Sequence, residues 1–147
     1  MDIKLTKDQY ENLIKLVYLG NWMINGIRLH DEQVEKYEKI EQYIFSFAKD
    51  AEMEKYIEYD GKSKKFFPTG EFEMESDIEN YRQEYEDEVF WEELVDRLAM
   101  RDFIRKYGED LIKKMDRKKR FEKEEPFVEK YEEEFEKHGI ERLEIKS

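Results

Sequence analysis

The segment YLGNWMINGIR carries two amides and a guanidinium within an otherwise apolar stretch. On a helix of 3.6 residues per turn, Asn21, Asn25 and Arg28 fall within about 60° of one another and form a polar strip. A buried polar group without a partner costs about 1–3 kcal/mol or more, so the strip must meet polar groups. Either it fixes helix register through loop carbonyls or an acid, or it lines a pocket where Arg28 binds a carboxylate or phosphate. The first role is the commoner one. For the second role, Asn21, Asn25 and Arg28 are the candidate ligand-binding residues.

Carboxylates at helical spacing suggest a different chemistry. Glu92 and Asp96 are four residues apart and share a helical face, and Glu35 in an earlier helix is a third candidate. Such carboxylates can hold a hard cation such as Mg²⁺. The segments DEQVE and EELVD resemble degenerate copies of the E-E-x-x-E and E-x-x-D helices of all-helical nucleotide pyrophosphohydrolases. This resemblance implies a Mg²⁺-dependent phosphohydrolase of nucleotide-like substrates, but it covers ten residues in a chain with 39 acids. A solvated acidic face is the competing interpretation.

Other reactive constellations are absent from the sequence or incomplete. The chain has no cysteine, which excludes disulfides, thiol catalysis and Cys-based metal sites. Neither His30 nor His138 follows a glutamate by three positions, so a ferritin-like di-iron site is excluded. No nucleophile elbow, P-loop or dinucleotide fingerprint occurs. We therefore expect no cofactor.

One basic cluster lies late in the chain. Its six members fall within eight residues: Lys113, Lys114, Arg117, Lys118, Lys119 and Arg120. The net charge of −12 opposes approach to nucleic acid or to an anionic membrane. We interpret the cluster as a solvated helical surface balanced by the acids that follow it.

Two longer segments carry a resemblance to known sequences. LTKDQYENLIKLVYLGNWMIN and FWEELVDRLAMRDF resemble parts of uncharacterised bacterial proteins of unknown function. The resemblance transfers no activity and no site residue. It favours a single intact domain.

The elements that would position these residues follow from apolar periodicity. A first helix is predicted over residues 7–29, with Thr6 as its N-cap. Apolar groups surround its axis from Leu16 to Ile27, which predicts the central helix of the fold, with Leu16 and Ile24 in the core. A second helix is predicted from an N-cap at Asp31 to about Glu54.

The rest of the chain is predicted to form a hairpin and further helices. The hairpin covers residues 55–67, with a two-residue type I′ turn at Asp60-Gly61. A third helix runs from a capping box at Ser76 to residue 107, with a bend or change of partner near residues 86–88. A last helical stretch begins near residue 109, is interrupted at Pro126 and ends at Gly139. The segments DIKL and IERLEI at the two ends are β-compatible and could pair.

Length and composition limit the classes of protein to which the chain can belong. A chain of 147 residues corresponds to one domain, and 15% aromatic residues argue against general disorder. The start of the chain lacks an export signal, and its longest uncharged run, twelve residues, is too short to span a bilayer. We expect a cytoplasmic protein with no membrane partner. Abundant Glu and Lys favour a thermophilic source.

Together these observations predict a mainly α single domain over residues 1–147. It is a bundle-like packing of four or five helices around the first, with a small β-hairpin and, as an open alternative, a short terminal strand pair. The function favoured is a non-catalytic interaction or regulatory domain with a protein partner or a second copy. The alternative is the Mg²⁺-dependent phosphohydrolase.

Overall fold

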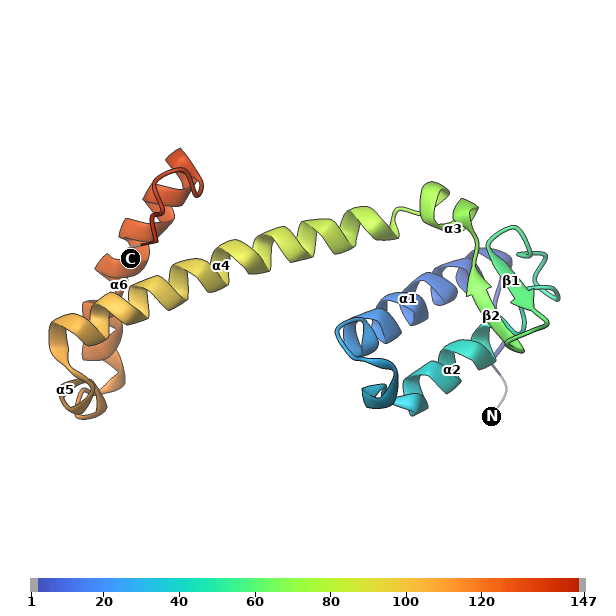
Figure 1. The fold of residues 1–147 in the computed structure, drawn as a ribbon, viewed down its shortest axis with the longest axis horizontal. Helices are drawn as coiled ribbons and strands as arrows, with labels where there is room; N and C mark the ends of the chain where they lie inside the picture. Colours follow the sequence, from blue (N-terminus) through green and yellow to red (C-terminus); the bar gives the residue numbers. More distant parts are fainter. Residues whose placement is uncertain (1–2, 146–147) are drawn as a thin grey trace. The chain divides into compact units, whose positions relative to one another are not determined.

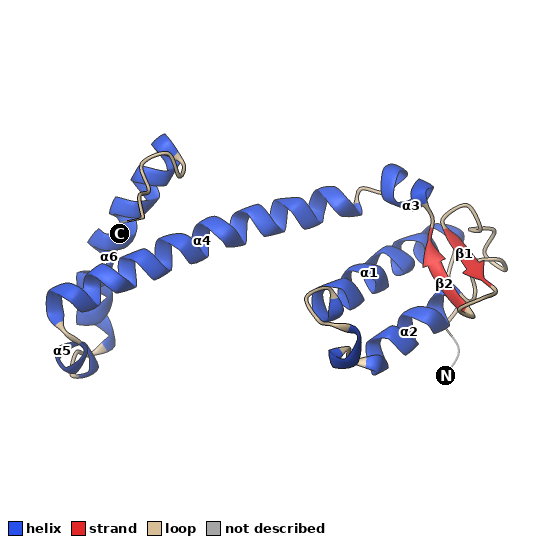
Figure 2. Cartoon of the chain, viewed as in Figure 1, coloured by secondary structure: helices blue, strands red, loops and turns tan. Residues whose placement is uncertain are grey.

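The computed structural model describes residues 3–145 and is mainly helical (Figures 1 and 2). In chain order its elements are α1 (Lys7–Asn25), a 3₁₀ turn η1 (His30–Glu32), α2 (Glu35–Phe45), β1 (Ile57–Asp60), β2 (Lys65–Pro68), α3 (Gly70–Glu75), α4 (Ile78–Tyr107), α5 (Glu109–Lys113) and α6 (Arg117–His138). The mainly α class and the small hairpin are confirmed. Within the described residues, no helix combines the length and apolar character needed to cross a membrane.

The chain divides into two compact units. The first unit ends at Gln83 and the second begins at Glu84, so the continuous helix α4 contributes residues to both. Each unit has its own cluster of buried apolar side chains. This division explains why the apolar stripe of the third predicted helix changes phase: Ile78 packs in the first cluster, whereas Val95 and Ala99 pack in the second. The predicted change of partner therefore occurs, and it does so without a break in the helix.

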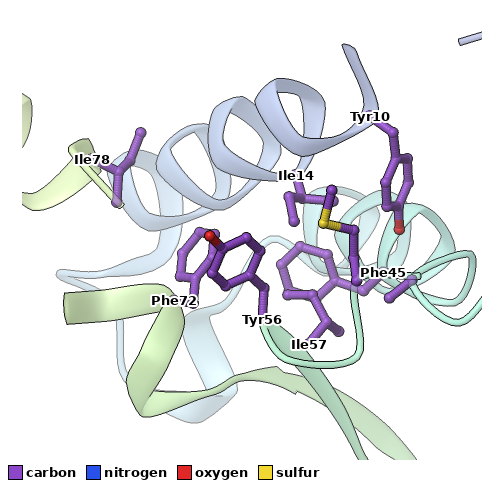
Figure 3. Packing of buried hydrophobic residues seen from close by; sticks show 9 residues of the cluster. Tyr10, Ile14, Phe45, Tyr56, Ile57, Phe72 and Ile78 are labelled. Atoms are coloured by element: carbon purple, nitrogen blue, oxygen red, sulfur yellow. The ribbon is translucent and has the colours of Figure 1, made fainter. Parts of the chain in front are cut away.

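The first unit is built on the pair α1 and α2, which lie side by side (Figure 1). Thr6 caps α1 as predicted: its Oγ1 accepts from the Gln9 amide at 3.2 Å, and the Gln9 side chain accepts from the Thr6 amide at 2.9 Å. Phe72 from α3 and Tyr56 pack beneath α1 (Figure 3). The Phe72 ring lies 5.3 Å from that of Tyr18 and 6.1 Å from that of Tyr56. These aromatic contacts hold α3 against α1.

The prediction that the first helix is the centre of the whole fold is wrong. Tyr10 and Ile14 are buried, but Leu16 is 66% exposed and Ile24 is half-buried. The apolar residues of α1 divide between the core of the first unit and a surface that this unit leaves uncovered. An all-round apolar helix therefore does not mark a fully buried one here.

The ends of the first two predicted helices also need correction. Helix α1 ends at Asn25, four residues early, because glycine is a poor helix former and the loop after Gly26 turns the chain toward α2. Asp31 lies inside η1 and is not the N-cap of α2, which begins after Val34. Helix α2 ends at Phe45, and irregular turns follow where the prediction continued the helix.

The hairpin has the predicted location but a different turn. Strands β1 and β2 are antiparallel with Asp60 opposite Lys65, which leaves a four-residue loop rather than the predicted two-residue type I′ turn. The Asp60 carboxylate accepts from the amides of Lys62 and Ser63 at 3.1 and 3.0 Å, and this side-chain turn stabilises the longer loop. Lys64 takes the positive φ of 57° that closes it.

The second unit pairs α4 with α6. The Phe135 ring stacks on that of Tyr131 at a centroid distance of 5.9 Å and lies tilted against that of Trp91 at 5.7 Å. Gly108 and Gly139 end their helices with φ values of 75° and 54°, as predicted.

Three further predictions are corrected by the structure. Helix α6 continues through Pro126, because contacts of its following apolar stripe with α4 offset the local cost of proline. Ser76 does not start a capping box: α4 begins at Ile78, and the buried Ser76 Oγ has no hydrogen-bond partner within residues 3–145. Residues 3–6 and 140–145 form no strand; Asp2, also in the predicted pair, lies outside the described residues.

Candidate functional site

The two asparagines of the predicted strip lie in a buried polar network between α1 and α2. Asn21 Nδ2 donates to a carboxylate oxygen of Glu41 at 2.9 Å, and Asn25 Nδ2 donates to Asn21 Oδ1 at 2.7 Å. Asn25 Oδ1 accepts from the Val34 amide at 2.8 Å. Since Val34 is the N-cap of α2 and supplies no side-chain cap, Asn25 satisfies a free amide at the start of that helix. The network therefore fixes the register of α1 against α2.

Glu41 is the member of this network that the sequence did not single out. Its side chain is 9% exposed, and burial raises its pKa to about 7; the hydrogen bond from Asn21 opposes this rise, and the nearby Glu38 adds to it. A signal was present in the sequence: Glu41 follows Tyr37 by four positions and precedes Phe45 by four, within the apolar stripe of α2. An acid at this position of the helix must be buried with the apolar side chains, unless the helix rotates and exposes them.

Arg28 is not part of the network. Because α1 ends at Asn25, Arg28 lies in the following loop and does not continue the predicted strip. Its side chain is half-buried and makes no hydrogen bond or ion pair with residues 3–145. The structure thus joins two of the three predicted site residues and leaves the third apart.

This arrangement predicts opposite outcomes for two substitutions. Asn25→Ala should lower the free energy of unfolding by about 1–3 kcal/mol, because it leaves the partly buried Val34 amide without its acceptor. Arg28→Met should change it by less than about 0.5 kcal/mol. Urea titrations measure both values. A large loss for Arg28→Met would reveal a buried partner, and loss of an anionic metabolite's stabilising effect in that variant would support the binding role.

Glu35, Glu92 and Asp96, the candidate metal ligands, do not form one group in the part of the chain that the structure describes. Glu92 and Asp96 are exposed on α4. Glu35 pairs with Lys39 at 2.7 Å, and this hydrogen bond lowers its pKa. Among residues 3–145, no three acidic or histidine side chains form a group able to hold a metal ion.

We accordingly expect millimolar Mg²⁺ or Mn²⁺ to leave the melting temperature unchanged. A site that binds only the folded chain would raise stability by about 2.7 kcal/mol at a ligand concentration of 100 Kd. Thermal melts with either ion, compared with the same concentration of Ca²⁺ and with EDTA, make the measurement. A rise specific to Mg²⁺ or Mn²⁺ that Asp96→Asn abolishes would contradict this expectation.

The basic cluster spans α5, the turn after it and the first turn of α6. Its side chains are exposed, and three of them pair with acids one turn away: Lys113 with Glu109, Lys118 with Glu122 and Arg120 with Glu124, at 3.4 to 3.9 Å. Binding of DNA or RNA weaker than micromolar at physiological salt remains our expectation. Fluorescence anisotropy with labelled single- and double-stranded oligonucleotides tests it. Tighter binding that is lost on neutralising Lys118, Lys119 and Arg120 would overturn it.

A further charged cluster joins α4 to α6 in the second unit. The Tyr131 hydroxyl donates to Asp102 at 2.5 Å and accepts from Arg101 at 3.0 Å, and Lys130 approaches Asp102 at 3.5 Å. The hydrogen bond from Tyr131, together with Arg101 and Lys130, holds the Asp102 pKa at about 2. Each charge in the cluster has a partner within it, so its evident role is to fasten the two helices.

Another candidate surface is apolar. One side of α1 contacts α2 through Asn21. A second side contacts later parts of the first unit through three pairs: Lys15 with Asp77, Tyr18 with Phe72, and Trp22 with Arg82. On the remaining side of α1 lie four uncharged residues at heptad spacing: Leu13, Leu16, Gly20 and Met23. Leu16 and Met23 are 66% and 56% exposed.

Helix α2 and the turn after it extend the same surface. Gln42 and Glu38 contact β2, so the side of α2 away from the hairpin is uncovered within the first unit. That side carries four exposed apolar residues: Tyr37, Ile40, Tyr43 and Phe47. Helices α1 and α2 lie side by side, and the rest of the first unit covers one side of the pair. The opposite sides of the two helices therefore lie on one face. We call these eight residues of α1 and α2 the open face.

An open cavity of about 920 Å³ lies at one end of the open face. Leu13, Tyr43 and Phe47 line it together with Ile3 and Leu5 from the segment before α1. The Tyr43 and Phe47 rings meet edge to face at 5.1 Å. The open face therefore combines a hollow with large aromatic side chains, as protein interfaces do.

Comparisons of the chain with models of known protein families, with curated proteins and with solved structures find no match.

Proposed function

We propose that this chain is a non-catalytic interaction domain that binds a protein through the open face. The supporting observation is the set of exposed apolar side chains on that face in a chain of which 45% of the residues are charged. Exposed apolar patches of this kind are typical of protein interaction sites. A cytoplasmic setting and a heat-adapted bacterial source belong to this proposal on the grounds of composition and resemblance.

The proposal predicts that capture of partners depends on the open face. The wild-type chain and its Leu16→Glu variant are tagged, incubated in an extract of the native cells that also contains the untagged chain, and compared by quantitative mass spectrometry. Leu111→Glu serves as the matched control, because Leu111 is a similarly exposed leucine, 50%, in the second unit. We expect a protein retained by the wild type and by the control and lost with Leu16→Glu. Identical sets of retained proteins for all three chains would overturn the proposal.

A further inference from the structure

We propose that the open face binds a second copy of this chain across a two-fold axis that passes near Gly20. This inference rests on the proposed function and names the partner. The proposed dimer would be a bundle in which the α1–α2 pairs of two chains cover each other's apolar side. Closed two-fold dimers use the same patch on both copies, so the patch must be complementary to itself.

Charge is the first argument for a second copy. Each chain carries a net charge of −12, so two copies repel each other over most approaches. The eight residues of the open face include no acid, and the adjoining charged residue of α2, Lys36, holds its Nζ 4.8 Å from the centre of the Tyr37 ring. Two copies can therefore meet on this face without burying a carboxylate, while the long Lys36 side chain keeps its charge at the edge of the contact. Because the remaining repulsion is screened by salt, added salt should tighten the association.

The area of the surface is the second argument. The open face continues into Ile3 and Leu5, which line the cavity at its end, and the large apolar side chains of this region are between 37% and 73% exposed, apart from the half-buried Leu13. With about 200 Å² for each fully exposed large side chain, they offer roughly 850 Å². A stable interface buries about 800 Å² per partner, and the largest apolar patch on a typical monomer is about 300–600 Å². The surface is thus large enough to hold a dimer together.

The pattern of residues along α1 is the third argument. Leu16 and Met23 lie four positions before and three after Gly20, so both are equally far from a point half a residue before Gly20. An antiparallel pairing of two α1 helices centred at this point, beside Gly20, therefore sets Leu16 opposite Met23 of the other copy. A Cβ at Gly20 would meet no atom within 4 Å, so the chain's own packing does not require the glycine. A close crossing of two helix backbones would need a small residue at this position.

Sedimentation equilibrium tests this pairing with charge exchange across the axis. The wild type should sediment at twice the chain mass of 18.3 kDa. Leu16→Glu and Met23→Lys should each raise the dimer dissociation constant by about tenfold or more, because each buries an unpaired charge. Neither should unfold the chain, since both side chains are exposed. The control Leu111→Glu should remain dimeric.

The double variant Leu16→Glu/Met23→Lys identifies the partner. In a two-fold dimer each new carboxylate faces a new ammonium of the other copy, so association should recover by about tenfold or more relative to either single variant. A double variant as weak as the singles, a wild type of 18.3 kDa, or a dimer unaffected by Leu16→Glu would each overturn the inference. A monomeric wild type that still captures a different protein through Leu16 would overturn it and leave the proposed function standing.

Discussion

Replacing Phe72 by alanine should lower the free energy of unfolding of the first unit by about 3–5 kcal/mol. The side chain is 0% exposed and contacts the rings of Tyr18 and Tyr56, so its removal leaves a cavity bordered by both. The chain has two tryptophans, one in each unit. In a Trp91→Phe background the fluorescence of Trp22 therefore reports unfolding of the first unit in urea.

Leu16→Ala is the matched comparison. Leu16 belongs to the same helix pair but is 66% exposed, and its truncation should cost less than about 1 kcal/mol at protein concentrations that keep the chain monomeric. Equal losses for the two substitutions would show that the open face is buried within the single chain.

Raising the pH from 4.5 to about 7 should destabilise the first unit through Glu41. The ordinary glutamate pKa is 4.5, and burial raises that of Glu41 to about 7 in the folded chain. Between these values the folded chain holds a proton that the unfolded chain has released, so the free energy of unfolding falls as pH rises. The contribution is complete below pH 4.5, is lost as pH rises through about 7, and is flat above that pH. Its size is on the order of 3 kcal/mol.

Glu41→Gln isolates this contribution from the other carboxylates. A glutamine keeps an oxygen that can accept from Asn21 but does not ionise. The variant should therefore be more stable than the wild type at pH 8 and close to it at pH 5. Urea titrations at both pH values supply the comparison. A difference between variant and wild type that is the same at both pH values would show that Glu41 titrates normally.

Local signals in the sequence predicted some of the helix boundaries, at residues that act on the adjacent turn, although the predicted caps at Asp31 and Ser76 were wrong. Thr6 starts α1, and Gly108 and Gly139 end α4 and α6, because capping depends on the residue and its near neighbours. The same local rules were wrong at Pro126 and at Asp60-Gly61. In both places other contacts, the packing of α6 on α4 and the hydrogen bonds of the Asp60 carboxylate, outweigh the local preference.

Burial was harder to predict because it depends on which elements meet. The apolar run of α1 indicated a fully covered helix, but the structure has one core in each unit and leaves Leu16 and Met23 uncovered. For a related reason, the structure joins only two of the three residues of the predicted polar strip. Asn21 and Asn25 need partners in any buried setting, while Arg28 belongs to the strip only if the helix continues to it. Glu41, the acid that completes the network, comes from another helix.

A single cysteine at position 20 tests most directly whether the open face is an interface between two copies. The chain has no cysteine of its own, a side chain at Gly20 has free space within the single chain, and cysteine is small enough for two helices to approach there. A two-fold axis near this position brings the two Cα atoms within the roughly 4.4–6.8 Å that a disulfide spans. Under mild oxidation Gly20→Cys should give a covalent dimer on a non-reducing gel, and adding Leu16→Glu should suppress it. Ser63→Cys, in the exposed loop of the hairpin, is the control for random collision. A Gly20→Cys chain that cross-links no more than Ser63→Cys would contradict the account.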